Sequence, residues 1–259
     1  MPELPWTRPE WLAEATAWIR ERAEVAGDIE QPHVRPWSTV LRAPTSEGDL
    51  YFKAVSAIHR YEPPLTGLLA ELQPDRVTEV VAVDAERGWM LMRDGGTRLR
   101  ELVETRADLH HWERLLPGYA RLQIEMAPQA ESLVELGVPD ERLAVLPDHF
   151  CELLATRPKG LTAEEHQRLM DAVPRARDMC RELAAYGIPE TIQHDDLHDG
   201  QVFVRDDGYR VFDWGDSCVS HPFHSLTVIL RMIAWQRHRC GLRPQALPRR
   251  RPDRNVAGR

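Results

Sequence analysis

The spacing of apolar residues is mainly typical of β-strands before about residue 95 and typical of helices after it. Before that point, residues 9–24 have helical spacing, and short apolar runs bounded by turn-rich segments favour β-strands. The expected strands form two pairs, joined by the turns PTSEG and DAERG, and cover 39–43, 50–55, 77–83 and 89–92. A second helix is expected from about Pro63 to Leu72, because prolines are tolerated in a first helical turn.

Helical spacing dominates beyond the segment RDGG at 93–96, which is predicted to be a flexible joint. The clearest helices are expected over 108–126 and 162–186, and the second begins with a capping-box spacing between Thr162 and Glu165. A polar loop, two short strands and a last apolar helix are expected at 191–200, 202–204, 209–212 and 222–236.

This order of elements predicts an α+β chain with two lobes. A small β-rich lobe is expected over 1–94 and a larger helical lobe over 95–236. The remaining segment, 237–259, is rich in Pro and Arg and has little to bury, so we expect a disordered basic tail. Because ligand clefts favour junctions between lobes, the functional site is expected between them.

The chain is acidic apart from this tail. Its net charge is −8, yet from Arg237 onward there are eight arginines and one aspartate, so residues 1–236 carry −15. This charge disfavours nucleic acid as a partner and suits cationic small molecules. The cysteines have no CxxC spacing, which fits a reducing cytoplasm; they are Cys151, Cys180, Cys218 and Cys240. With no apolar leader and no apolar run of about 20 residues, we expect a cytoplasmic protein without a membrane partner.

The segment TIQHDDLHDG, residues 191–200, concentrates histidines and aspartates. A short hairpin follows it, and its end is expected to bring Asp213 back opposite Gln201. Asp196, Gln201 and Asp213 are therefore expected to converge on one point. Two carboxylates and an amide oxygen are the hard ligands that Mg²⁺ prefers, and a carboxylate left free of the metal can accept a proton from a hydroxyl.

Two motifs on either side of this hairpin carry a family resemblance. HDDLHDGQ, residues 194–201, resembles the HGDLHxxN loop of the aminoglycoside phosphotransferases and related small-molecule kinases. VFDWGDS, residues 211–217, resembles the I-D-W-x-D segment that takes the place of DFG in that family. GWMLMRDGG at 88–96 is similar to the last small-lobe strand and hinge of these kinases. The resemblance runs in order from about residue 35 to 236 and implies a protein-kinase-like two-lobe fold.

The resemblance also implies an activity and residue roles. It implies an ATP-dependent phosphotransferase that uses Mg²⁺ and moves the γ-phosphate to a hydroxyl of a small molecule. Asp196 stands where the family has the catalytic base, Gln201 where it has a metal-binding asparagine, and Asp213 where an aspartate bridges Mg²⁺ to the phosphates. Lys53 resembles the strand lysine that contacts the phosphates, and Glu62 resembles its ion-pair partner.

Four further positions are interpreted in the light of the same resemblance. Ser38, in RPWST at 35–39, occupies the place of a glycine-rich loop and is expected to contact phosphate. His194 and His198 are expected to shape the catalytic loop rather than to react. Asp216 is interpreted as a helix cap or a second metal contact, with capping preferred.

The sequence departs from the family pattern at several points. Asp195 replaces the usual glycine of the loop, Gln201 is one methylene longer than asparagine, and Ser225 stands where an aspartate commonly braces the loop. The Arg- and Pro-rich tail also stands where family members continue with helices. These departures support an alternative hypothesis, a non-catalytic nucleotide-binding relative.

Two other interpretations of the cluster fit the sequence less well. A metal phosphohydrolase would need ligands spread over several helices, whereas these residues lie on one loop and one hairpin. A solvated loop with a charged turn would explain the cluster alone, but not the order and spacing of five matching segments. The sequence specifies neither the acceptor nor the oligomeric state.

Overall fold

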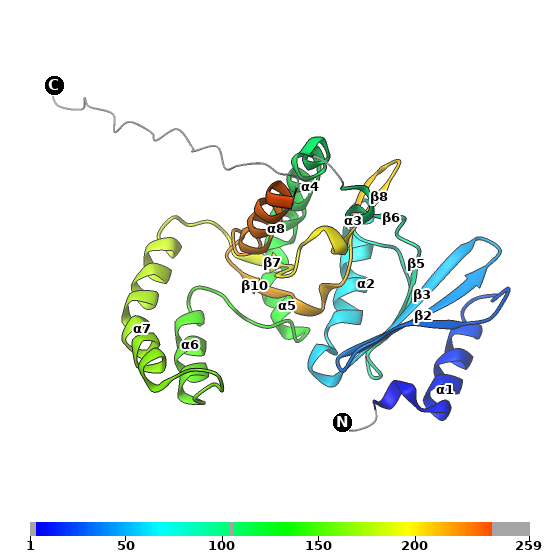
Figure 1. The fold of residues 1–259 in the computed structure, drawn as a ribbon, viewed down its shortest axis with the longest axis horizontal. Helices are drawn as coiled ribbons and strands as arrows, with labels where there is room; N and C mark the ends of the chain where they lie inside the picture. Colours follow the sequence, from blue (N-terminus) through cyan, green and yellow to red (C-terminus); the bar gives the residue numbers. More distant parts are fainter. Residues whose placement is uncertain (1–3, 104–105, 240–259) are drawn as a thin grey trace.

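A five-stranded antiparallel sheet forms the first lobe, and a group of helices forms the second (Figure 1). The computed structural model describes residues 4–103 and 106–239. The strands lie in the order β1-β2-β3-β5-β4. Their bounds are β1 Glu30–Val34, β2 Ser38–Thr45, β3 Gly48–Val55, β4 Val80–Asp84 and β5 Trp89–Arg93. The predicted α+β architecture with two lobes is confirmed.

Three strands lie close to their predicted positions, and two differ. The edge strand β1 was not predicted, because EQPHV contains a proline and most of its residues are only partly buried. Strand β4 begins at Val80 rather than at residue 77. Val77 instead forms an isolated β-bridge with Val211 in the second lobe. The apolar run from 77 to 83 therefore pairs with both lobes.

Helix α1 (Pro9–Arg20) covers one face of the sheet with aromatic side chains. The ring centroid of Phe52 on β3 lies 5.6 Å from Trp18 and 5.3 Å from Trp89, and both pairs pack edge to face. Neighbouring residues of a strand point to opposite faces, so Lys53 projects away from this cluster. The packing of α1 therefore fixes the strand that carries Lys53 into the cleft.

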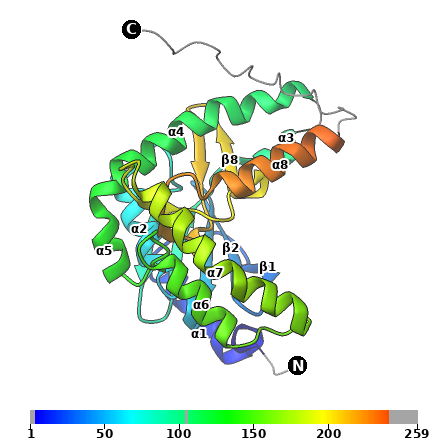
Figure 2. The same ribbon diagram turned by 90° about the vertical axis from the view of Figure 1, so that its left-hand side faces the viewer.

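Helix α2 and the helices after β5 build a second core. Their bounds are α2 Glu62–Leu72, α3 Leu99–Leu102, α4 His110–Met126, α5 Ala130–Glu135, α6 Leu146–Ala155, α7 Ala163–Ala184 and α8 Leu226–Arg239. The core contains apolar residues from α2, α4, α8 and the short strands, among them Leu69, Trp112, Leu122, Ile192 and Ile229. Helices α6 and α7 lie side by side on one flank of this lobe (Figure 1 and Figure 2). Within the described residues, no helix is long and apolar enough to cross a membrane.

The predicted helices are present, with corrections to the bounds of three of them. Helix α1 ends at Arg20 rather than at residue 24. Thr162 and Glu165 form the expected capping box, although α7 ends at Ala184 rather than 186. The last helix begins at Leu226 rather than 222, because the chain turns at His221–His224. It also reaches Arg239, so the first three residues of the tail predicted over 237–259 are helical; the rest of that segment lies outside the described residues.

Short strands position the motif region. Strand β7 (Thr191–Gln193) pairs with β10 (Cys218–Ser220), and β8 (Val202–Arg205) lies between β6 (Thr97–Arg98) and β9 (Gly208–Val211). The β8–β9 hairpin was predicted, but its register differs by one residue. The two-residue turn pairs Arg205 with Gly208, which places Gln201 opposite Phe212 rather than Asp213.

Candidate active site

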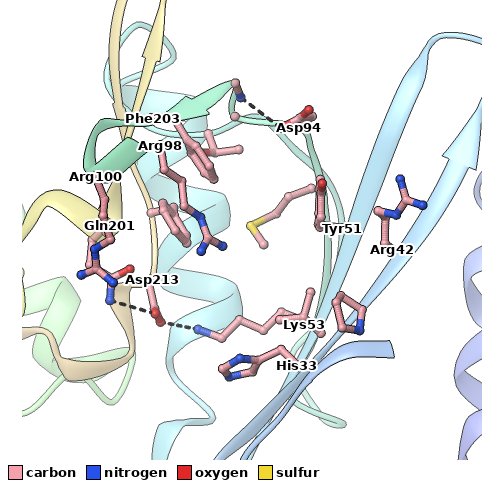
Figure 3. Close-up of a pocket in the computed structure, with 18 of the residues that line it drawn as sticks. His33, Arg42, Tyr51, Lys53, Asp94, Arg98, Arg100, Gln201, Phe203 and Asp213 are labelled. Carbon is pink, nitrogen blue, oxygen red and sulfur yellow. Dashed lines mark hydrogen bonds and ion pairs between the residues drawn. The ribbon is translucent and has the colours of Figure 1, made fainter. Parts of the chain in front are cut away.

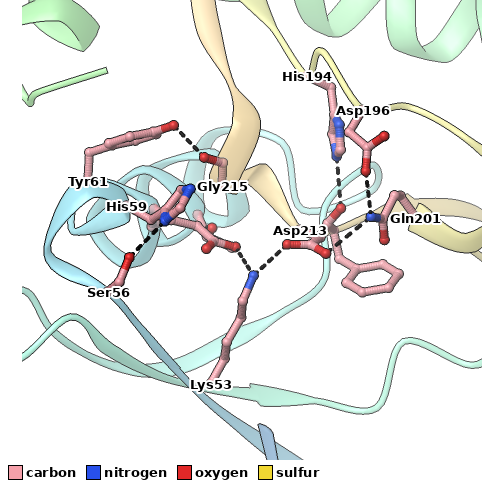
Figure 4. Close-up of polar contacts among 12 residues, drawn as sticks. Lys53, Ser56, His59, Tyr61, His194, Asp196, Gln201, Asp213 and Gly215 are labelled. Atoms are coloured by element: carbon pink, nitrogen blue, oxygen red, sulfur yellow. Dashed lines mark hydrogen bonds and ion pairs between the residues drawn. The ribbon is translucent and has the colours of Figure 1, made fainter. Parts of the chain in front are cut away.

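Lys53 lies between two carboxylates from different parts of the chain (Figure 4). Its Nζ is 2.5 Å from Glu62 Oε1, at the start of α2, and 2.5 Å from Asp213 Oδ1, just after β9. Lys53 and Glu62 are both buried, with 8% and 1% of their surfaces exposed. The expected ion pair between Lys53 and Glu62 is therefore present, while contact with phosphate stays a prediction.

The three charges respond differently to burial. Burial opposes the charged form of Lys53, but the carboxylates of Asp213 and Glu62 outweigh it and raise the pKa of the lysine. Burial raises the pKa of Glu62 to about 7 against the attraction of Lys53. Burial opposes ionisation of Asp213 as well, but the positive charge of Lys53 outweighs burial and lowers the pKa of Asp213 to about 2. Asp213 is thus the firmly ionised partner of the lysine.

Gln201 joins the two motif aspartates. Its Nε2 lies 3.1 Å from Asp196 Oδ2 and 3.1 Å from Asp213 Oδ2, so the amide donates to both. The structure thus brings together the three residues expected to converge. Asp213 reaches this position despite the register difference because its backbone is left-handed, with φ 66°. Asparagine and aspartate tolerate that conformation better than most side chains.

Asp196 faces the cleft and is ionised near neutral pH. Its side chain is 39% exposed, and His198 Nε2 lies 3.4 Å from its Oδ2. Burial opposes the charged form, but hydrogen bonds from His198 and Gln201 outweigh it and lower the pKa of Asp196. An ionised, partly exposed carboxylate of this kind is able to orient a hydroxyl and accept its proton.

The two histidines hold the shape of the loop. His194 is fully buried, and its Nε2 donates to the carbonyl of Phe212 at 2.8 Å. Burial lowers the pKa of His194, so the ring is neutral. His198 Nδ1 accepts the backbone N–H of Gly200 at 2.8 Å, which leaves Nε2 to face Asp196. These contacts agree with the shaping role expected for both residues.

Asp199 anchors the other side of the same loop. It accepts a hydrogen bond from Arg100 Nε at 3.0 Å and another from Gln236 Nε2 at 2.9 Å. Gln236 also accepts from the indole of Trp112 at 2.9 Å, so α8 and α4 fix the loop together. Asp199 and Gln236 were not singled out from the sequence, because no local pattern links positions so far apart.

The cleft between the lobes contains two adjoining hollows. The larger has a volume of about 670 Å³ and extends from Lys53 past Tyr51 and Met92 to the stacked rings of Phe203 and Phe212 (Figure 3). The smaller, of about 480 Å³, is lined by residues of the polar cluster; they include Ser38, Lys53, Glu62, Asp196, Gln201 and Asp213. All six residues predicted for the site therefore border one cleft.

The sequence predicted a role for Ser38 at the cleft but none for Phe203 and Phe212. Ser38 is buried and lines both hollows, so its position fits the expected phosphate contact, which stays a prediction. Phe203 and Phe212 stack with ring centroids 4.3 Å apart and form one wall of the larger hollow. Their place on the hairpin was predicted, but their shared face depends on the register.

The donor set was tested for a divalent cation. Within the described residues, no group of three or more His, Cys, Asp or Glu side chains is arranged to hold a metal. Asp213 and the Gln201 amide still fit Mg²⁺, which binds through few protein oxygens. Burial and the carboxylates of Asp196 and Asp213 raise the pKa of Asp216, which indicates excess negative charge that a cation would offset.

A family model decides the relationship of this chain to known proteins. Residues 53–247 match the model of the phosphotransferase enzyme family. The chain belongs to this family. No curated protein matches the sequence at a significant level. The matched segment spans Lys53, the loop 194–201 and Asp213, so all of the polar cluster except Ser38 lies within the family domain.

Solved structures of family-like phosphotransferases share the fold. A ternary complex of an aminoglycoside phosphotransferase with streptomycin and ATP has a TM-score of 0.59 at 13% identity, covering 93% of this chain and 84% of that one. A GDP complex of aminoglycoside 2'-phosphotransferase-IIIa gives 0.60 at 12%, with coverage of 89% and 82%. A choline/ethanolamine kinase family protein from Mesorhizobium loti gives 0.56 at 20%, with 88% and 74%. The expected kinase-like two-lobe fold is confirmed.

The departures from the phosphotransferase pattern have structural counterparts. Asp195 adopts φ 58°, a left-handed backbone that explains the glycine usual at this position, and its Oδ1 contacts His224 Nε2 at 2.7 Å. Ser225 donates to Gln193 and contacts the hydroxyl of Tyr119 at 2.8 Å. That hydroxyl accepts the backbone N–H of His194 at 3.0 Å. Ser225 and Tyr119 together therefore brace the catalytic loop.

Proposed function

We propose that this protein is an ATP-dependent phosphotransferase that moves the γ-phosphate of ATP to a hydroxyl of a small molecule. One observation carries the proposal. The amide of Gln201 donates to Asp196 and Asp213 at 3.1 Å each, and Asp213 in turn binds Lys53. A phosphate-binding group and a candidate base are thus held next to each other at one end of the cleft.

Lys53 and Asp213 form the phosphate side of this site. In the proposed complex, Lys53 donates to the phosphates of the nucleotide while Glu62 keeps the ammonium in place. Asp213 would hold Mg²⁺, and Gln201 would join it through its amide oxygen once the amide turns, because its Nε2 donates to Asp213 in this structure. When bound, that cation offsets negative charge on the phosphates and on the carboxylates around it.

Asp196 forms the acceptor side. Its exposed carboxylate orients the acceptor hydroxyl and takes its proton as the oxygen attacks the γ-phosphorus. A third hollow, of about 360 Å³, is lined by the preceding residue, Asp195, together with Glu141 and Asp216. Such an acidic wall favours a cationic acceptor, in keeping with the acidic body of the chain.

The comparisons give no support to the non-catalytic alternative. Asp195 occupies the left-handed position without disturbing Asp196, and Ser225 braces the loop through Tyr119. Gln201 reaches both aspartates with its longer side chain. We therefore retain that alternative only as an outcome of the test.

Transfer of radiolabelled γ-phosphate to a panel of acceptors tests the proposal. The panel contains aminoglycosides, macrolides, choline-like amines and amino alcohols, each assayed with ATP and with GTP. Asp196→Asn is the matched control, since it keeps the shape of the side chain. Label transfer to an acceptor by the native chain alone supports the proposal; nucleotide binding without transfer to any acceptor would favour the non-catalytic alternative.

A further inference from the structure

Arg98 lines the larger hollow of the cleft. It ends the short strand β6, directly after the joint between the lobes, and β6 pairs with β8 at Phe203. Its guanidinium carbon lies 5.7 Å from the ring centroid of Phe212 and 6.0 Å from that of Phe203. Figure 3 shows the guanidinium pointing into the hollow on the side of Lys53 and His33.

The other arginines of this hollow are bound to carboxylates. Arg42 contacts Asp49 at 2.8 Å and Glu30 at 3.0 Å. The Nε of Arg93 lies 3.0 Å from Glu79. Each of these side chains is directed toward protein carboxylates, so its charge is largely offset before any ligand binds.

Arg100 and Lys53 also form ion pairs with carboxylates. Arg100 Nε lies 3.0 Å from Asp199, and Lys53 lies between Glu62 and Asp213. Within the part of the chain that the structure describes, Arg98 alone among the Arg and Lys side chains of this hollow has no carboxylate partner. Its contacts are the faces of the two phenylalanines, which leave its N–H groups free to donate.

His33, which also borders the hollow, adds no competing positive charge. Burial lowers its pKa, and the charges of Arg35, Lys53 and Arg98 lower it further despite Asp213. The ring is therefore neutral at pH 7. The uncompensated positive charge on this side of the hollow belongs to Arg98.

The loop above the hollow offers few backbone donors for phosphate. In RPWST, Pro36 has no N–H, and the N–H of Arg35 donates to the carbonyl of Ser38 at 2.8 Å. A bound polyphosphate therefore needs side-chain donors from elsewhere in the cleft. Arg98 reaches the hollow from the opposite lobe.

We infer that Arg98 binds the phosphate chain of the nucleotide while its guanidinium rests on Phe212. The inference rests on the proposed function, because the hollow beside Lys53 must hold a nucleoside polyphosphate. A guanidinium suits this role, since its planar fork can stack on an aromatic ring and donate to phosphate oxygens together. Arg98 thereby links the joint between the lobes to the bound nucleotide.

Calorimetric titration with adenosine, ADP and ATP, each with Mg²⁺, tests this assignment. Arg98→Gln removes the charge, and Arg42→Gln is the matched control because Arg42 borders the same hollow but is held by carboxylates. Arg98→Gln is expected to weaken ADP and ATP binding by about tenfold or more, the effect of one charged hydrogen bond. Adenosine affinity should stay within about twofold, and Arg42→Gln should change the affinity of all three ligands little.

The outcomes separate the assignment from the proposed function. Equal losses for adenosine and ADP in Arg98→Gln would show that Arg98 packs on the nucleoside, and unchanged ADP affinity would show no role; either result overturns the inference. Arg98→Lys keeps charge but not the fork, so it should recover part of the ADP affinity. If the native protein binds none of the three ligands, the proposed function itself fails, and the role of Arg98 fails with it.

Discussion

Lys53 and Asp213 are 160 positions apart in the sequence, yet Nζ and Oδ1 lie 2.5 Å from each other. The lysine comes from the sheet and the aspartate from the hairpin of the helical lobe. Their contact crosses the cleft and sets where a bound phosphate would meet positive charge. The first prediction follows from it.

Lys53→Ala should weaken stabilisation of the protein by ATP and Mg²⁺. Ligand at a hundred times its dissociation constant adds about 2.7 kcal/mol to the unfolding free energy, and loss of a phosphate contact reduces that gain. Thermal melting at millimolar ATP measures the effect, with the exposed Lys159→Ala as control. A full ATP-dependent shift in Lys53→Ala would show that the lysine does not contact the nucleotide.

Asp196→Asn should preserve folding and nucleotide affinity but lower turnover by about 10²-fold or more, because the amide cannot accept the proton of the acceptor. Asp206→Asn, in the exposed hairpin turn, should leave turnover unchanged. Steady-state kinetics and ATP titration of both variants check this. An equal loss of ATP affinity in Asp196→Asn would instead indicate a metal ligand.

The unfolding free energy should depend on pH through Glu62. Its pKa rises on folding from an ordinary 4.5 to about 7, so the folded protein binds the proton more tightly than the unfolded chain. Its contribution is present in full below pH 4.5 and is lost as the pH rises to about 7, by at most about 3 kcal/mol. Urea unfolding should show a flatter slope over this range for Glu62→Gln; an unchanged slope would contradict the raised pKa.

Gln201→Asn and Gln201→Ala should both raise the Mg²⁺ concentration needed for half-maximal ATP binding. The native amide reaches both aspartates, whereas asparagine is one methylene shorter, and Mg²⁺ tolerates displaced ligands poorly. Titration of Mg²⁺ at fixed ATP compares the three proteins. If neither variant changes the metal dependence, residue 201 is not a ligand.

Tyr119→Phe should destabilise the protein by about 1–3 kcal/mol, because the buried N–H of His194 loses its acceptor. Ser225→Ala should cost less, since Tyr119 keeps that contact. Urea unfolding of the two variants gives the comparison, and turnover should fall more in Tyr119→Phe. Equal stabilities would mean that the hydroxyl does not brace the loop.

The convergence of Asp196, Gln201 and Asp213 could be predicted because these residues lie in two dense motifs. Asp196 and Asp213 are close in the sequence and are separated by a short hairpin, so the hairpin brings their side chains together. The register was wrong by one residue, since a turn at Asp206 and Asp207 pairs Arg205 with Gly208. With its left-handed backbone, Asp213 still lies beside Gln201 as expected. No sequence pattern predicts that backbone conformation.

Other parts of the molecule depend on contacts that local patterns do not encode. Helices α5 and α6 were not predicted, because their apolar spacing is short and is interrupted by loops. Arg98 is one of several charged residues around the joint, and the rings that it contacts, Phe203 and Phe212, lie more than a hundred positions later. Its lack of a carboxylate partner depends on where the neighbouring arginines bind, which the sequence does not specify.

The contact between Asp199 and Gln236 gives the site an order of assembly during synthesis. The loop 194–201 leaves the ribosome before α8 does, so Asp199 has Arg100 and His198 as partners before Gln236 can reach it. Gln236 is buried and also accepts a hydrogen bond from the indole N–H of Trp112. A nascent chain that stops short of α8 would carry every residue of the proposed catalytic cluster and still lack the anchor that sets the loop.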